Sequence, residues 1–334
     1  MRNTMNFVDL CRGEFGRKVA YTGVDRITPQ NVVKVVSDTI GIHNRNRTLI
    51  DYLYRYMKGD QPILYRNKIV RPEVNNRVVE NHAFETVKFK AGQICGEPIQ
   101  YVCKKKNADK KINEQVDLLN DYLDEANADA RNIQRAIYQS ATGTSYKAIL
   151  KEEDWTENGD LPPFRIFIPY PGDCYIVYSQ RNGKPMLSVQ ILKDEDEQQY
   201  YLCYSKNQFF KITNGKVTEY GINGFGGIPI VECPNNHDRL SDVEIAITLF
   251  DAINKYQSDR LNGVEQFVQS FMKFKNCEVD KNEFLEMVKL GAISVKDTGN
   301  GCQSDVELMT AELNQSESQV AKDDIYNNML IVEA

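Results

Sequence analysis

The sequence has few of the residues on which metal sites and disulfide frameworks depend. In 334 residues it has one tryptophan, three histidines and eight cysteines, and no two cysteines form a Cys-x-x-Cys pair. Structural zinc needs closely spaced Cys and His ligands, and disulfide frameworks belong to short, cysteine-dense secreted chains. We therefore expect the reduced thiols of a cytosolic product, with no metal ion and no cofactor.

Long apolar runs are also missing. No window contains eighteen consecutive apolar residues, and charged residues from Arg2 to Lys18 interrupt the N-terminal segment. A membrane-spanning helix needs about 20 apolar residues, and a signal peptide needs an uninterrupted apolar core. The sequence predicts neither, so we expect no membrane partner.

An excess of positive charge is missing as well. Lys and Arg number 41 against 47 Asp and Glu, which gives a net charge of −6. Proteins that coat nucleic acid by bulk attraction need Lys and Arg to neutralise phosphates. That class is excluded, whereas a channel that repels DNA is not. With 41% hydrophobic residues, 18 Tyr and 14 Phe, the composition is that of a globular protein with a substantial core.

Apolar periodicity predicts an α-rich first half followed by a β-rich segment. Spacings of three and four residues predict helices at 29–40, 45–58, 78–95, 112–124 and 126–142. A short strand is expected at 99–103. From residue 145 the period becomes two, and strands are predicted at 145–152, 164–168, 174–178, 185–192, 199–204, 208–213, 216–220 and 228–232. The pattern predicts an α+β fold with an antiparallel meander.

A long helix is predicted after the meander. Ser241 and Glu244 form a capping box, in which a hydroxyl at the N-cap and a carboxylate three residues later satisfy free N–H groups. Apolar residues then recur every three or four positions as far as Phe274. A helix of this length is a rod of roughly 50 Å, and its apolar stripe needs a partner along its length.

A small mixed unit and the start of another helix follow the rod. Strand, helix and turn patterns are expected between Cys277 and Leu313, with a helix at 281–290, strands at 292–297 and 306–313, and a glycine-rich turn at 299–301. Helical spacing resumes at 316–334 and stops without a cap, so we expect the natural protein to continue beyond Ala334.

Catalytic motifs are weak. The glycine-rich segment Gly224–Gly227 lacks the Lys-Ser/Thr and the helix of a phosphate-binding loop, and it predicts a tight turn. His82, Glu85 and Cys95 could be offered as a thiol nucleophile with its base. However, positions 82 and 95 lie about three and a half turns apart on one predicted helix, too far for a hydrogen bond. No convergent catalytic set can be assembled, and we predict that the protein is not an enzyme.

The order of several features resembles the portal proteins of tailed bacteriophages, in particular the Bacillus-phage-type family, from about Leu49 to Ala334. The residues that carry the resemblance are the 52–59 segment, Asn75, Asn76, Arg77, Val79, Asn81, Gly92, Gly96, Pro98, Tyr138, Ala141, Gly143, Tyr146, Pro169, Pro171, Gly224 to Gly227, Pro229, Asn235, Asn236, Ser241, Asp242, Glu244, Leu249, Asp251, Ala252, Asn254, Ser258 and Asp259. No one of these motifs is diagnostic, but their order is specific.

The resemblance implies the portal fold, with a mixed α/β wing, long stem helices and a small α/β clip. Transferred to this sequence, it places the wing at 1–239, the first stem helix at 240–275 and the clip at 276–313. The start of the second stem helix falls at 314–334, before the tunnel loop and the crown of the family.

The resemblance also implies a function. Portal proteins form a ring of twelve copies at one capsid vertex of the virion, assembled in the bacterial host cytoplasm. Double-stranded DNA passes through the ring without sequence specificity, and the ring meets the terminase large subunit, the head-tail adaptor and the major capsid or scaffold protein. We predict that Lys273 and Lys275 lie near the DNA path or the clip interface. Cations at a helix C-terminus, which the helix dipole favours, are an equal alternative for these two residues.

Two other functions stay open on the sequence alone. One is a cytosolic enzyme with its site in the α/β region, and the other is a monomeric binding module whose rod folds back on its own wing. Thiol alkylation would distinguish the first from a portal, and the solution mass would distinguish the second.

Overall fold

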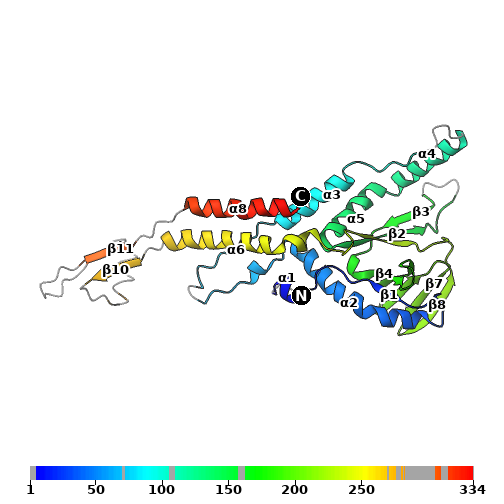
Figure 1. Cartoon of the computed structure of the whole chain (residues 1–334), viewed down its shortest axis with the longest axis horizontal. Coiled ribbons are helices and arrows are strands. Elements are labelled where there is room, and N and C mark those ends of the chain that lie inside the picture. Colours follow the sequence, from blue (N-terminus) through cyan, green and yellow to red (C-terminus); the bar gives the residue numbers. More distant parts are fainter. Residues whose placement is uncertain are drawn as a thin grey trace. The chain divides into compact units, whose positions relative to one another are not determined.

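A computed structural model describes residues 5–69, 72–104, 110–156, 162–268, 271–275, 280, 282, 305–309 and 315–333 (Figure 1). The chain divides into two compact units. Unit 1 comprises Met1–Tyr65, Val79–Asp251 and Met329–Ala334, and unit 2 comprises Arg66–Val78 and Ala252–Asn328. None of the described helices is long and apolar enough to cross a bilayer.

Helices make up much of the first part of unit 1. They are α1 (Phe7–Cys11), α2 (Val32–Met57), α3 (His82–Cys95), α4 (Lys110–Glu125) and α5 (Ala128–Thr142), with short 3-10 turns at Pro62–Tyr65 and Pro171–Asp173. The predicted helices in this part are confirmed, although α3 begins four residues later than predicted and α1 was not predicted. One further difference concerns α2. The segments predicted at 29–40 and 45–58 form one continuous helix, α2, in which the buried His43 Nε2 lies 2.8 Å from the carbonyl oxygen of Gly172.

Two sheets complete unit 1. Strands β1 (Ala20–Thr22), β4 (Cys174–Ser179), β5 (Pro185–Lys193), β6 (Gln199–Tyr204), β7 (Gln208–Thr213) and β8 (Lys216–Ile222) form a six-stranded sheet in the order β1-β4-β5-β6-β7-β8. Strands β3 (Phe164–Phe167), β2 (Thr144–Lys151) and β9 (Ile230–Pro234) form an antiparallel three-stranded sheet in that order.

The predicted meander is therefore confirmed only from β4 to β8. β2, β3 and β9 leave it to form the second sheet, and the three-residue β1 joins β4 in parallel. A strand of three residues is too short to show an alternating pattern, which explains why the sequence does not predict β1. The strand predicted at 99–103 is wrong. In that segment the backbone of Tyr101 pairs with the side chain of Asn120 instead of with a neighbouring strand.

The main core lies between α2 and one face of the six-stranded sheet. Val32, Val35 and Val36 of α2 pack among buried sheet residues such as Val189 and Phe210. The opposite face of β4 packs against the three-stranded sheet through Cys174, Ile176, Tyr146, Ala148 and Ile230. α2, the six-stranded sheet and the three-stranded sheet thus form packed layers with hydrophobic residues between them, as an α+β fold requires.

The long helix α6 (Asp242–Val268) follows β9 and has 27 residues, which corresponds to a length of about 40 Å. Its first ten residues belong to unit 1 and the rest to unit 2. Unit 2 also contains β10 (Phe271–Lys275), which pairs with β11 (Asp305–Met309), and most of α8 (Gln315–Glu333).

The helix predicted to continue to Phe274 therefore ends earlier, at Val268. Residues 271–275 are a strand, because backbone pairing with β11 from Phe271↔Met309 to Lys275↔Asp305 replaces the helical bonds. The strand predicted at 306–313 overlaps β11, and α8 confirms the helix predicted at 316–334. The helix, strand and turn predicted between 281 and 301 lie outside the described residues, Asn282 excepted.

A glycine at the end of α5 provides a test of this fold. Gly143 has φ +83°, and a Cβ atom there would lie 2.1 Å from the carbonyl oxygen of Arg239. Gly183 also has a positive φ, +67°, but a Cβ atom there would have no other atom within 4 Å. Both conformations disfavour side chains, and only Gly143 adds a steric clash.

We expect Gly143→Ala to lower the free energy of unfolding by about 3 kcal/mol and Gly183→Ala by about 1 kcal/mol. Urea denaturation followed by circular dichroism measures both values. Equal losses in the two variants would show that the approach of Arg239 to Gly143 is not a tight contact.

Candidate functional site

The start of α6 is the best-connected part of unit 1. The capping box predicted from the sequence is confirmed: Val243 N donates to Ser241 Oγ at 3.0 Å, and Ser241 N donates to Glu244 Oε2 at 3.2 Å. Ser241 Oγ in turn donates to the carbonyl oxygens at the end of α5, with 2.8 Å to Ala141. The cap thereby joins the first turn of α6 to the last turn of α5.

Glu244 has a second function that the sequence does not reveal. Its carboxylate accepts from Gly16 N at 2.6 Å and forms a buried ion pair with the Arg17 guanidinium. Both side chains are almost fully inaccessible to solvent. A single carboxylate therefore holds the N-terminal segment, the N-cap and its own helix together.

Asp242 extends this network to α3 and to the loop after β9. Its carboxylate accepts from Lys90 Nζ at 2.8 Å, from Ser140 Oγ at 2.6 Å and from Asn235 Nδ2 at 2.9 Å. Asn235 also donates to the carbonyl oxygen of Leu240. The residues that carry the resemblance in this part of the sequence, Asn235, Ser241, Asp242 and Glu244, thus meet in one cluster.

The loop before α6 is fixed by a further ion pair. Arg239 has a positive φ of 57°, and its Nε lies 2.8 Å from Glu232 Oε1 on β9. Glu232 also accepts from Tyr178 Oη at 2.5 Å. Burial raises the pKa of Glu232, but the hydrogen bonds and the charge of Arg239 outweigh it and lower the pKa below its usual value.

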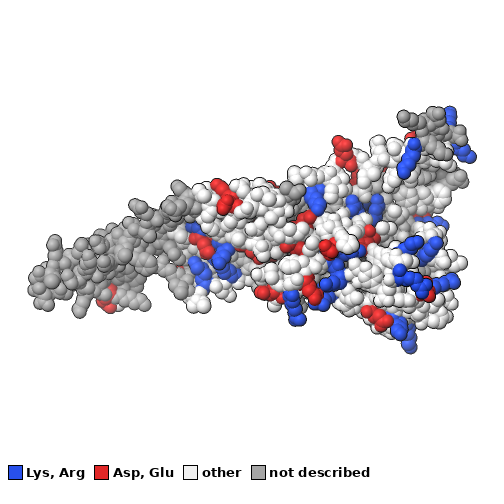
Figure 2. All heavy atoms as spheres, in the orientation of Figure 1, with Lys and Arg blue, Asp and Glu red and all other residues white. Residues whose placement is uncertain are grey.

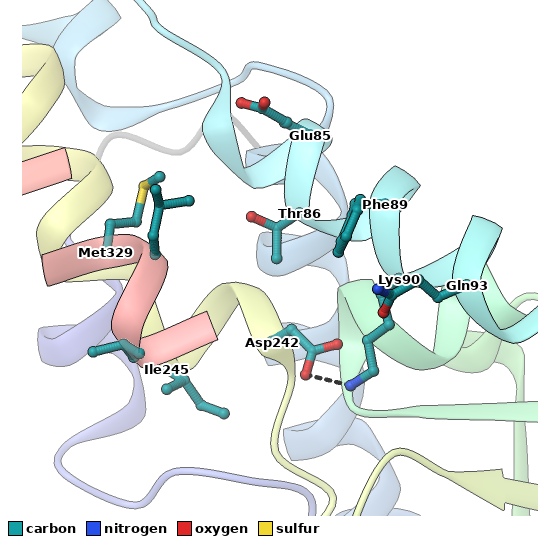
Figure 3. A pocket seen from close by; sticks show the side chains of 10 residues that line it. Glu85, Thr86, Phe89, Lys90, Gln93, Asp242, Ile245 and Met329 are labelled. Atoms are coloured by element: carbon teal, nitrogen blue, oxygen red, sulfur yellow. Dashed lines mark hydrogen bonds and ion pairs between the residues drawn. The ribbon is translucent and has the colours of Figure 1, made fainter. Parts of the chain in front are cut away.

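An apolar pocket of about 500 Å³ adjoins this cluster in unit 1 (Figure 3). Its walls come from α3, from the start of α6 and from the end of α8, and the Lys90–Asp242 ion pair lies beside it. Phe89, Ile245, Met329, Leu330 and Val332 supply most of its apolar surface. The pocket lacks a set of converging acids and bases, since Lys90 and Asp242 already neutralise each other.

The thiol considered as a nucleophile is placed away from His82, the base considered with it. Cys95 Sγ lies 3.5 Å from the carbonyl oxygen of Asn132, whereas His82 contacts Glu80 and Glu85 at the other end of α3. In the described part of the chain, no group of three or more His, Cys, Asp or Glu side chains could hold a metal ion. The described residues around the start of α6 thus form a scaffold of ion pairs and helix caps.

In unit 2 a ladder of polar contacts attaches the segment Arg66–Val78 to α6. Asn76 N donates to Asn262 Oδ1 at 2.7 Å, and Val78 N donates to Ser258 Oγ at 2.9 Å. Asn76 Nδ2 lies 2.7 Å from Glu265 Oε2, and Arg66 forms an ion pair with Asp259 at 2.8 Å. This ladder contains three of the residues that carry the resemblance, Asn76, Ser258 and Asp259. Asn76 is far from the other two in the sequence.

Lys273 and Lys275, predicted to lie near the DNA path or the clip interface, are on β10. Their cross-strand partners in the register are Glu307 and Asp305 of β11. The alternative of two cations at a helix C-terminus is wrong, because α6 ends at Val268. Three residues of the clusters described above, Arg17, Lys90 and Asn262, lie in no recognisable sequence motif and were not predicted.

The buried pair at the start of α6 leads to a first prediction for this site. Glu244→Gln removes one charge and leaves the Arg17 guanidinium buried without a counterion, so we expect the free energy of unfolding to fall by about 3 kcal/mol. Glu14→Gln is the matched control, since Glu14 pairs with Arg45 and Lys18 at the surface and should cost less than about 1 kcal/mol. Chemical denaturation of both variants measures the difference. Similar losses of unfolding free energy would show that the buried Glu244–Arg17 pair is no more important to the fold than a surface ion pair.

Asp251 leads to a pH prediction. It accepts a hydrogen bond from the buried Tyr56 at 2.8 Å, and burial raises its pKa to about 6. A carboxyl whose pKa is higher in the folded state stabilises the fold most below the unfolded pKa, near 4, and this contribution is lost as the pH rises through about 6.

From pH 4 to pH 7, wild type should therefore lose about 1–2 kcal/mol more of its free energy of unfolding than Asp251→Asn does. Tyr56→Phe should increase this loss, because the Tyr56 hydrogen bond lowers the pKa of Asp251. Denaturant titrations at several pH values test both statements. The same pH dependence in wild type and Asp251→Asn would contradict them.

A known protein family matches most of the chain. The family model described as "Phage portal protein, SPP1 Gp6-like" matches residues 37–334. No curated protein matches. Among solved structures, "Neck of native GTA particle computed with C12 symmetry" is similar at 12% identity and a TM-score of 0.39, over 75% of this chain and 63% of that one.

"Neck of empty GTA particle computed with C6 symmetry" is similar at 10% identity and a TM-score of 0.39, over 82% of this chain and 66% of that one. This chain thus spans a little under two thirds of the length of either neck chain. The family model covers most of the described residues, and the clusters at Asp242 and in unit 2 lie within it, whereas Gly16 and Arg17 precede the matched residues. The chain belongs to the SPP1 Gp6-like family of phage portal proteins.

Proposed function

We propose that this chain is a structural, non-enzymatic subunit of a ring located at one capsid vertex of a virion. The observation that carries the proposal is the portal family match over residues 37–334. Exposed apolar side chains on α6 support it, because Leu261 and Val264, three residues apart on the helix, are each more than a third exposed. Neighbouring copies in a closed ring would cover such side chains through repeated heterologous contacts.

The same family membership supports a division of the chain into domains. We propose that residues 1–239 form the wing, 240–275 the first stem segment, 276–313 the clip and 314–334 the start of the second stem helix. Within the stem segment the helix itself would be Asp242–Val268, and β10 would connect this helix to the clip. The polar ladder of unit 2 would hold the segment Arg66–Val78 on the stem helix.

The ring would be a channel for double-stranded DNA during packaging and ejection, and a docking site for the terminase, the head-tail adaptor and capsid or scaffold protein. The net charge of −6 supports a channel that lets DNA slide, since a basic wall would bind phosphates. On the face shown in Figure 2, positive and negative side chains are interspersed among neutral ones. We place Lys273 and Lys275 near the clip interface or the DNA path.

The solution mass tests this function first. A closed ring of twelve copies of 38.3 kDa has a mass of about 460 kDa. We expect light scattering to give a mass in this range and particle images to show rings with a central hole wide enough for duplex DNA. A mass that stays at 38.3 kDa over a wide concentration range would contradict the proposal.

A further inference from the structure

Two surfaces of unit 1 carry charged side chains most of which form no ion pair with the residues that the structure describes. The first is on α4, a helix of 16 residues that has no buried residue. Asp117, Asp121 and Glu125 recur at helical spacing on one side of α4, and none of them forms an ion pair in the described part of the chain. Leu118 lies between them and is 47% exposed. We call this set, with Glu114, which pairs with Lys110 at 3.8 Å, the acidic face of α4.

The second surface is cationic and is formed by α5 and β2. Arg131 and Arg135 lie one turn apart on α5, and Lys147 lies on β2. None of these three cations has a carboxylate partner among the described residues. Their polar partners are amides and a thiol: Arg131 donates to Gln134, Arg135 to Gln139 and Cys95, and Lys147 Nζ to Asn132 Oδ1 at 3.0 Å. We call this set the cationic cluster.

The cationic cluster is only partly solvated, which makes its lack of counterions costly. All three side chains are half-buried, and Arg131 Nε is buried without a hydrogen-bond partner. Burial and the nearby charge of Arg135 lower the pKa of Lys147. Like charges that are removed from water repel one another more strongly than exposed ones, so a bound carboxylate would stabilise this surface.

Apolar side chains beside the cluster indicate the kind of partner. Val231, the cross-strand partner of Lys147, is 57% exposed, and Ile149, two residues further on β2, is 40% exposed. A nucleic-acid backbone offers phosphates but no apolar group at this spacing. The acidic face of α4 offers both carboxylates and Leu118, so the two surfaces are complementary in charge and in apolar character.

We propose that the acidic face of α4 in one copy binds the cationic cluster of a second copy. This inference rests on the proposed ring, and it names the surfaces through which neighbouring wings recognise each other. The two surfaces differ, so the contact is heterologous and repeats around a cycle. Charge complementarity of this kind fixes which patches meet and raises the rate of association.

A charge exchange tests the contact. The first variant, Arg131→Glu with Arg135→Glu, reverses the cationic cluster. The second, Asp117→Lys with Asp121→Lys, reverses the acidic face. We expect each variant alone to reduce the fraction of chain found in rings by about tenfold at a fixed concentration. The combination of all four changes in one chain should restore the rings, because opposite charges meet again.

A matched control has the same change in net charge at another surface. Lys206→Glu with Lys216→Glu changes the net charge as the arginine variant does, and it alters exposed residues in the β6–β7 turn and at the start of β8. It should leave the fraction in rings unchanged. Circular dichroism and the unfolding midpoint of each variant separate loss of contact from loss of fold. All of these substitutions are at exposed positions, except those at Arg131 and Arg135. If the chain with all four changes forms rings again, its fold tolerates the substitutions at Arg131 and Arg135.

Each outcome decides between the proposals. If wild type forms rings and the single-surface variants do so equally well, the docking inference is wrong and the ring stands. If both variants lose rings but the combination does not recover them, the two surfaces do not bind each other. If the arginine variant keeps its rings but no longer retains a short DNA duplex, the cluster binds phosphate instead. A wild-type chain that stays monomeric overturns both proposals.

Discussion

The arrangement of unit 1 depends on one buried carboxylate. Glu244 completes the capping box of α6, pairs with Arg17 and accepts from the backbone of Gly16. A carboxylate that is removed from water is stable only when its oxygen atoms accept hydrogen bonds or pair with a cation. The N-terminal segment and the N-cap must therefore both be in place before the long helix can begin where it does. Asp242, in the same turn, extends this requirement to α3 and α5.

What could be predicted from the sequence was mainly what is decided locally. The capping box lies within four residues, and the helices and long strands of unit 1 follow apolar periods that do not depend on distant contacts. Arg17 could not be predicted as the partner of Glu244, since 227 residues separate them. The end of α6 at Val268 was missed for a similar reason, because pairing with β11 decides the conformation of residues 271–275. The same holds for the candidate site. The capping residues Ser241 and Glu244 were recognised from the sequence, whereas the cations Arg17 and Lys90 were not.

The two units hold α6 by different means. In unit 1, Val243, Ile247, Phe250 and Ile253, the last just beyond its border, line a buried apolar side of the helix. In unit 2, Asn254, Ser258 and Asn262 are equally buried but polar, and Ser258 and Asn262 receive hydrogen bonds from the backbone of the Arg66–Val78 segment. Apolar packing tolerates small shifts, whereas hydrogen bonds specify one position. The polar side chains thus fix the alignment of the segment on the helix.

The spacing of these polar residues has a mechanical consequence. Asn254, Ser258 and Asn262 recur every four residues, which is close to one helical turn, a rise of about 5.4 Å. A shift of the segment by a fraction of a turn would leave buried donors and acceptors unpaired. A shift by one turn would offer each donor another polar side chain. Sliding of the segment along the helix would therefore proceed in discrete steps, as in a ratchet, and the bonded position resists gradual deformation under load.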